Sequence, residues 1–247
     1  MRSGWKFVIM SVLALAVFGC TSVNIQKAEV SKVKTVAMVG FEMYRQTDGS
    51  TFGIVGDLVS SNKLDKNEKD LAESCYKVLT AQLGKEQKWK FVSIDKIRNN
   101  KGYGKFFKEN GRASKLVLNI GKRYKIDGVA TPKAISDMSY EERQKMLKEL
   151  GVDAIASFDA FIYRGESFSI AGFEYSKYRI TLDSFEIYSN TSKDPIVSIT
   201  DLVGDTPETG HFAANINNLV KLKTNTDKGI LGATAEIAKS MSKEMKF

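Results

Sequence analysis

The first twenty residues constrain this chain more than any other stretch, because they do not have the pattern of a folded domain. A positively charged start precedes an apolar run over residues 7–18, which closes on Gly19-Cys20. Such a start, a short apolar run and a small residue at its end are typical of a secretory signal peptide, here residues 1–19. A single membrane-spanning anchor is the less favoured alternative, because a spanning helix needs roughly 20 apolar residues.

The end of this run carries a more specific pattern. Val17-Phe18-Gly19-Cys20 resembles the bacterial lipobox. The resemblance implies that Cys20 receives a diacylglycerol and a fatty acid such as palmitate, and becomes the first residue of the mature lipoprotein. Thr21 follows where an aspartate would imply retention at the inner membrane, so the resemblance implies an outer-membrane anchor facing the periplasm. The alternative is an ordinary signal peptide with an incidental cysteine.

Composition limits the covalent chemistry of the mature chain. Removal of the signal peptide leaves 228 residues, enough for one domain with a substantial core or for two small domains. The net charge falls from +8 to about +6 when Arg2 and Lys6 are lost, which suits an anionic neighbour and equally suits plain solubility. If Cys20 is lipidated, Cys75 has no partner for an intramolecular disulfide. Its helical spacing from Leu71 predicts a buried, unreactive thiol.

The first part of the mature chain predicts a strand, a helix and a second strand. Residues 34–41 form a valine-rich apolar run that ends in Gly40-Phe41 and indicates a buried strand. Asp65 opens a helix that continues to about Gly84, and residues 89–94 are aromatic and β-branched. This order implies a crossover connection between parallel strands. Residues 20–32, which have no strong period, are expected to be a tether between lipid and domain.

The second part predicts a meander between two helices. Ser139 and Glu142 form a capping box at a helix start, and Gly151 ends that helix. Three strands are expected over residues 152–163, 178–188 and 196–203, with a register shift near Ser184, before a closing helix over residues 227–246. We therefore predict an α/β (α+β) fold, one domain over residues 33–247 with a single mixed sheet of about five strands and helices packed on it.

Residues 85–125 are the most basic stretch, with thirteen lysines and arginines against three acidic residues. In a cytosolic protein this pattern would suggest nucleic acid, but export to the envelope argues against a nucleic-acid partner. The remaining functional interpretation is contact with phosphate-bearing lipid or an acidic partner. The alternative is a solvated helix face whose interleaved aromatic residues turn inward.

Three segments are candidate contact surfaces. The first is the long connection over residues 42–64, which carries its own apolar residues. The second is the basic stretch, and the third is an aromatic excursion or hairpin tip over residues 165–176. The residues chosen to represent them are Phe52, Ile54, Val55, Lys101, Lys105, Lys108, Phe168 and Phe173.

The sequence contains no signature of catalysis, and we predict that the protein is not an enzyme and uses no cofactor. His211 is the one histidine, so the usual zinc sites cannot be built from it and Cys75. No serine lies in a nucleophile-elbow motif, and no phosphate-binding glycine loop is followed by lysine. The acidic residues lie mostly beside lysines and are interpreted as surface residues.

Three stretches are similar to one group of bacterial envelope proteins: residues 35–41, residues 151–155, and residues 181–188 with the following 195–200. The group includes the curli secretion lipoprotein CsgG, the penicillin-binding-protein activator LpoB and the amino-terminal domain of TolB. The resemblance implies a non-catalytic α/β domain that binds another envelope protein or assembles with itself.

The leading hypothesis is therefore a lipid-anchored envelope protein whose domain is a binding or assembly module. Its expected partners are the membrane, through Cys20, and an envelope protein or a second copy of the chain. Two alternatives remain open. A cell-wall or polysaccharide hydrolase or lyase would need acidic residues and His211 to converge in one cleft. A periplasmic carrier of a small apolar ligand would need an enclosed pocket near Phe161, Phe168 and Phe173.

Overall fold

The computed structural model describes residues 21–45, 65–112, 122–170, 173–205, 211–213 and 219–246. The predicted signal peptide, Cys20, and Phe52, Ile54 and Val55 of the long connection lie outside these residues. The elements are β1 (Ser22–Ile25), α2 (Lys27–Val30), β2 (Thr35–Arg45), α4 (Asp65–Gln87), β3 (Lys90–Phe91), α5 (Ile94–Arg98), α6 (Lys101–Glu109), β4 (Lys122–Lys125), α7 (Pro132–Ser136), α8 (Tyr140–Leu150), β5 (Ala154–Ile170), β6 (Phe173–Ser189), β7 (Val197–Val203), β8 (His211–Ala213) and α9 (Leu219–Met245).

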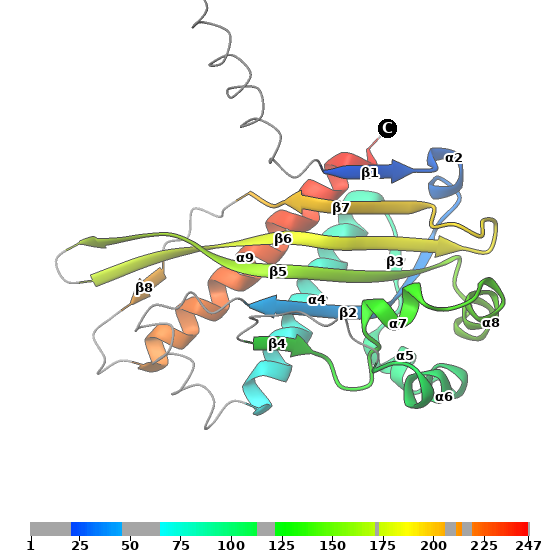
Figure 1. The fold of residues 1–247 in the computed structure, drawn as a ribbon, viewed down its shortest axis with the longest axis horizontal. Coiled ribbons are helices and arrows are strands. Elements are labelled where there is room, and N and C mark those ends of the chain that lie inside the picture. The colour runs from blue at the N-terminus through cyan, green and yellow to red at the C-terminus, as the bar shows by residue number, and fades with distance from the viewer. Residues whose placement is uncertain are drawn as a thin grey trace, which may run out of the picture.

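One mixed sheet organises the domain (Figure 1), which confirms the predicted fold class. Its strand order is β1-β7-β6-β5-β2-β3, with β4 added to β2 and β8 added to β6. Strand β2 runs parallel to β3 and β5, as the crossover required, and β5, β6 and β7 form the predicted antiparallel meander. The sheet has eight strands instead of about five, because β1, β4 and β8 span only three or four residues each and leave no pattern in the sequence.

Helices α4 and α9 cover one face of the sheet. Ile230, Ile237 and Met241 of α9 are fully buried against this face, which confirms the apolar stripe expected for the closing helix. Cys75 of α4 lies in the same core, and burial raises the pKa of its thiol to about 12. The thiol is therefore protonated at neutral pH, as predicted for a buried cysteine.

Helices α5 to α8 cover part of the opposite face and form a second, smaller core. The capping box of Ser139 and Glu142 is present, and Gly151 ends α8 in the left-handed conformation with φ of 65°. The register shift predicted near Ser184 is also confirmed, since Asp159 pairs with Ser184 and the next residue of β5 pairs with Leu182. Within the described ranges, no helix is long and apolar enough to cross a membrane.

The prediction of a tether over residues 20–32 is wrong from Ser22 onward. Strand β1 pairs antiparallel with β7, so that Ser22 lies opposite Thr200 and Ile25 opposite Val197. Helix α2 follows at once, and Val30 is buried in the main core. Four residues of strand leave no period, and β1 forms because β7 offers it an edge. The folded domain therefore begins at residue 22.

Asp153 holds the start of β5 against the start of β2. Its Oδ2 accepts hydrogen bonds from the backbone N–H of Lys34 at 3.0 Å and from the N–H and hydroxyl of Thr35 at 2.8 and 2.9 Å. Burial works to raise the pKa of the Asp153 carboxyl, but these hydrogen bonds outweigh it and the pKa is lowered. Residues 151–155, one of the three stretches similar to envelope proteins, therefore include a carboxylate that joins two parallel strands.

Asp153→Asn should lower the free energy of unfolding by about 1 kcal/mol at neutral pH, since the charge-assisted hydrogen bonds are weakened. Because the folded pKa is depressed, the carboxylate contributes stability above its unfolded pKa of about 3.9 and loses it as the pH falls. Urea unfolding from about pH 7 to about pH 3 should show the variant and the wild type converging at the acidic end. The exposed Asp194→Asn is the control, and a pH-independent difference for Asp153→Asn would contradict the assignment.

Candidate functional site

Helix α6 presents the predicted basic residues to solvent. Lys101, Lys105 and Lys108 are all exposed, and their spacing places them along one side of the helix. On the other side Tyr103 is 1% exposed, and Phe106 and Phe107 pack against the second core. The inward turn of the aromatic residues was the alternative interpretation of the basic stretch, and it is confirmed. The helix thus offers its cations outward on a firmly packed base.

Two contacts fix α6 in place. The Tyr103 hydroxyl donates to the Val39 carbonyl at 2.8 Å and accepts from the Ala130 N–H at 2.7 Å, which ties the helix to β2 and to the segment before α7. Asn100, the N-cap residue of α6, donates from its side-chain amide to the Glu149 carbonyl of α8 at 3.0 Å. The three lysines therefore project from a rigid element, which suits a recognition surface.

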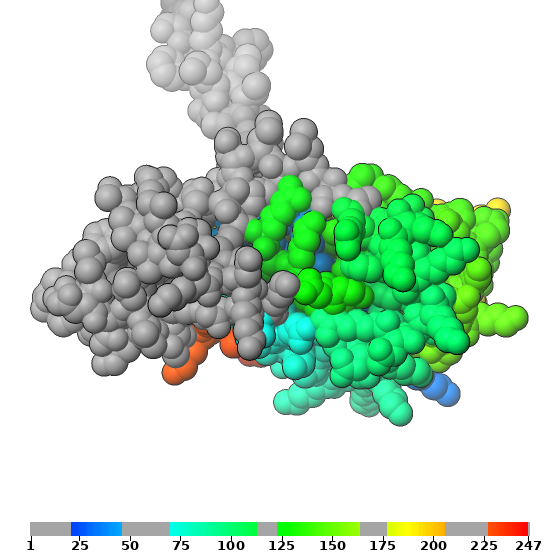
Figure 2. Space-filling model, turned by 90° about the horizontal axis from the view of Figure 1, so that it is seen from below, coloured from blue at the N-terminus to red at the C-terminus, as the bar shows by residue number. Residues whose placement is uncertain are grey.

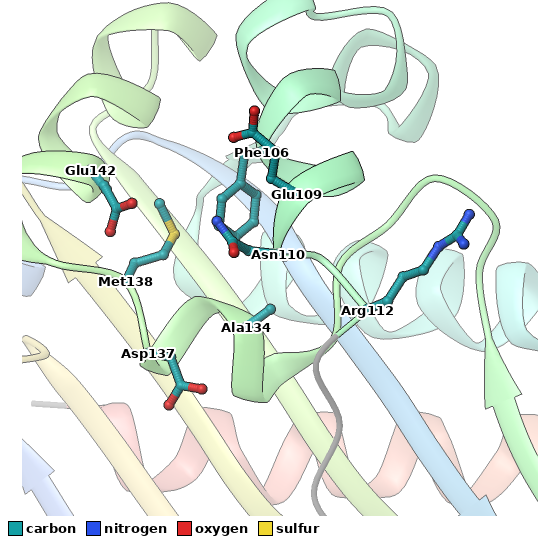
Figure 3. A pocket seen from close by; sticks show the side chains of 8 residues that line it. All are labelled: Phe106, Glu109, Asn110, Arg112, Ala134, Asp137, Met138 and Glu142. Atoms are coloured by element: carbon teal, nitrogen blue, oxygen red, sulfur yellow. The ribbon is translucent and has the colours of Figure 1, made fainter.

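A pocket of about 460 Å³ opens beside this basic face. Figure 3 shows its floor, formed by apolar atoms of Phe106 from α6, Ala134 from α7 and Met138 from the α7–α8 connection. Its charged and polar lining comes from both sides: Glu109, Asn110, Arg112, Asp137 and Glu142. In the close-up, Arg112 extends away from the α7 and α8 side chains, so its guanidinium lies on a different side of the pocket from Asp137 and Glu142.

Two of the three pocket carboxylates already have structural roles. Glu142 Oε2 accepts from the Ser139 N–H at 2.8 Å as part of the capping box. Asp137 pairs with Lys133, whose Nζ lies 2.6 Å from Oδ2. Glu109 is exposed at the end of α6, one turn from Lys105. The pocket is thus an amphipathic recess at the edge of a basic helix face, with Glu109 and Arg112 at its mouth.

A second polar feature, missed by the sequence reasoning, lies inside the sheet. Glu42 of β2 and Asp159 of β5 are each 1% exposed and occupy paired positions on neighbouring parallel strands. The interpretation of the acidic residues as surface residues is wrong for these two. The available signal was their place within apolar strand runs, Glu42 between Phe41 and Met43 and Asp159 within residues 154–162.

Strand β4 supplies cations to this buried pair. Lys125 Nζ lies 3.0 Å from Glu42 Oε1 and an Arg123 guanidinium nitrogen lies 3.9 Å from it, while the Tyr44 hydroxyl donates to Glu42 Oε2 at 2.6 Å. Burial, this hydrogen bond and the charge of Asp159 raise the pKa of Tyr44, so its hydroxyl remains a donor. Within the described part of the chain, no group of three or more His, Cys, Asp or Glu could hold a metal ion. The contacts of Glu42 with Lys125 and Arg123 join β2 to β4.

The remaining predicted site residues are not brought to α6. Phe168 pairs with Tyr175 and Phe173 with Ile170 near the tip of the β5–β6 hairpin, where the backbone but not these side chains is described. Figure 1 places that tip and α6 at opposite ends of the domain. The predicted contact residues therefore form at least two separate surfaces.

The two alternative functions gain no converging site from the described residues. His211 lies in β8 opposite Ser176, with its side chain outside the described atoms. Phe161, expected to line an apolar ligand pocket, stacks on Tyr44 with ring centroids 5.2 Å apart. The space beside Phe161 is thus occupied by a protein side chain. That the protein is not an enzyme stays a prediction.

Comparison with known proteins adds little to this description. No protein-family model matches the chain, and no curated protein matches its sequence. Among solved structures the chain is similar to the crystal structure of lipoprotein GNA1162 from Neisseria meningitidis, at 11% identity and a TM-score of 0.29, covering 80% of this chain and 97% of that one. A likeness this weak carries no argument about family or function. The resemblance to CsgG, LpoB and TolB stays a prediction.

Proposed function

We propose that this chain is a lipid-anchored protein of the bacterial cell envelope whose single domain binds another envelope component through the α6 surface. This surface comprises the exposed lysines Lys101, Lys105 and Lys108 together with the neighbouring pocket. The proposal for the anchor rests on the lipobox-like residues that end in Cys20. An outer-membrane position facing the periplasm follows from Thr21 under the sorting rule that accompanies the lipobox.

The observation that carries the binding role is the outward row of lysines on a helix whose other side is fixed to the core. Long charged side chains held on a rigid helix attract an oppositely charged partner over several ångströms and raise its association rate. The apolar floor of the pocket, with Phe106 and Met138, offers a recess for an apolar side chain of that partner. An anionic protein surface that carries an exposed apolar side chain would fit both the lysine row and the pocket.

Reversing the three charges should weaken partner binding about tenfold, which corresponds to about 1.4 kcal/mol. The variant is Lys101→Glu with Lys105→Glu and Lys108→Glu. A photo-crosslinking residue at Glu109, on the rim of the pocket, would first identify the partner in intact cells. The affinity of the purified partner for wild type and variant would then be measured by calorimetry at fixed salt concentration.

The matched control reverses three exposed lysines on the helices that cover the opposite face, Lys77→Glu with Lys228→Glu and Lys239→Glu. It imposes the same change in net charge on the whole protein, so long-range electrostatics change equally. Binding by the control should stay within about twofold of the wild type. Equal losses in the two triple variants, or an unchanged affinity in both, would contradict the α6 surface.

A further inference from the structure

We propose that the domain stands edge-on to its membrane, with β1 against the phospholipid headgroups and the α6 surface turned away from the bilayer. This orientation rests on the proposed lipidation of Cys20. It goes beyond the anchor itself, because a long flexible tether would leave the domain free to present any face to the membrane. The partner assigned to the β1 edge is the headgroup layer of the anchoring leaflet.

The first argument is the shortness of the connection. Only Thr21 separates Cys20 from β1, and two residues of extended chain span at most about 7 Å. The Thr21 hydroxyl also donates to the carbonyl of Asp201 in β7, at 3.3 Å. A tether running through residue 32 could have reached about 40 Å. Because β1 is paired, the lipid-bearing residue cannot move far from this corner of the sheet.

The second argument is the character of the edge. Strand β1 ends the strand order and hydrogen bonds to β7 alone among the described strands. Residues 21–26 are Thr-Ser-Val-Asn-Ile-Gln, without a charge, whereas exposed edge strands usually carry charged residues that prevent pairing with other chains. A headgroup layer held against β1 would instead prevent this pairing, because it would keep other chains away from the edge.

The third argument is that the exposed apolar side chains lie at the same corner of the sheet. In the described part of the chain, the large hydrophobic side chains that are exposed are Val23 of β1 at 39% and Val203 of β7 at 47%. Ser22 lies opposite Thr200, so Val203 lies just beyond the end of β1 from which Cys20 departs. Both valines therefore flank the anchor, where the interfacial region of a bilayer can cover them.

The ends of α4 and α9 complete this side of the molecule. Lys246 pairs with Glu86 at 2.8 Å and the Gln87 side chain donates to the Ser242 carbonyl, so the two helices end together. In the view of Figure 1, the C-terminal end of α9 lies on the same side of the sheet as β1. The Lys243 and Lys246 side chains are 69% and 58% exposed and can reach lipid phosphates. These cations lie on the anchor side of the domain.

The α6 surface lies on the other side. From β1 to β3 the sheet has five interstrand spacings, about 24 Å in all. In Figure 1, α5 and α6 lie on the side of the sheet away from β1, and in Figure 2 they occupy part of the surface seen from below. With β1 on the membrane, Lys101, Lys105 and Lys108 would face the space beyond the anchoring leaflet. A partner would therefore be met away from the bilayer.

The test places a nitroxide label at each edge of the full lipidated protein. Asn24→Cys labels β1 and Lys105→Cys labels α6, while the buried Cys75 should not react. The protein is reconstituted in vesicles of about three parts phosphatidylethanolamine to one part phosphatidylglycerol, doped with a nickel-chelating lipid. Relaxation by headgroup nickel should be at least about fivefold stronger at position 24 than at position 105, given the width of the sheet.

A matched variant tests the role of the short connection. Insertion of about 12 Gly/Ser residues after Thr21, with a root-mean-square length of about 19 Å, should bring the two labels to similar relaxation. Intact mass spectrometry of the same samples reports the lipid on Cys20. Equal relaxation at both positions in protein that carries the lipid would overturn the orientation and leave the anchor standing. Protein without lipid on Cys20 would overturn the anchor and the orientation together.

Discussion

Replacing Cys20 with serine should give a protein that carries no lipid and moves almost entirely from the membrane fraction to the soluble fraction. The lipobox resemblance implies attachment through the cysteine sulfur, and a hydroxyl does not replace a thiol as that nucleophile. Each buried methylene of an acyl chain contributes about 0.8 kcal/mol, so two or more chains together give a stable membrane anchor. Intact mass and fractionation of cell envelopes measure the two parts of the result.

The control for this substitution is Cys75→Ser. Cys75 is 1% exposed within the main core, so its replacement tests the general effect of removing a thiol without touching the lipobox. That variant should keep its lipid and stay with the membrane. A lipid still found on the Cys20→Ser protein would show that the lipid is attached at another residue. The proposed orientation of the domain would then be wrong as well.

Local sequence signals predicted much of the fold. The capping box at Ser139, the left-handed Gly151 and the stripe of α9 each depend on residues within a few positions of one another. Side-chain alternation also predicted the three strands of the meander, although β5 and β6 are longer than expected, at 17 residues each. These features are readable because helix ends and strand faces are set by nearest neighbours along the chain.

The errors arose where structure depends on distant partners. Strand β1 is four residues long and exists through pairing with β7, about 175 residues away. Residues 22–25, which the sequence analysis assigned to a tether, are therefore part of the sheet. Residues 46–64, where Phe52, Ile54 and Val55 were expected to form a contact surface, lie outside the described ranges, so that prediction stays open.

The candidate site was predicted in part for the same reason. The exposure of Lys101, Lys105 and Lys108 follows from helical spacing, which a sequence displays directly. The pocket beside them forms only because α6, α7 and the α7–α8 connection pack together, and no local sequence pattern predicts that packing. The buried Glu42 lies among strands from three parts of the chain, so the general rule that acidic residues lie mostly beside lysines gave the wrong prediction for it.

Glu42→Ala should have the largest effect on stability, lowering the free energy of unfolding by about 3–5 kcal/mol. The carboxylate is 1% exposed and takes a hydrogen bond from Tyr44 and an ion pair from Lys125. Its loss leaves the buried Tyr44 hydroxyl facing a cavity without a partner, and it removes the ion pair of Lys125, whose side chain is 40% exposed. Urea denaturation followed by circular dichroism measures the change.

A double-mutant cycle separates this charge pairing from simple loss of volume. Combining Glu42→Ala with Lys125→Ala removes both partners, so the double variant should be less destabilised than the sum of the two single variants, with a coupling of about 1–3 kcal/mol. The exposed Glu141→Ala on α8 controls for removal of a carboxylate and should change stability by less than about 0.5 kcal/mol. Strict additivity in the cycle would mean that Glu42 does not stabilise the sheet through its ion pair with Lys125.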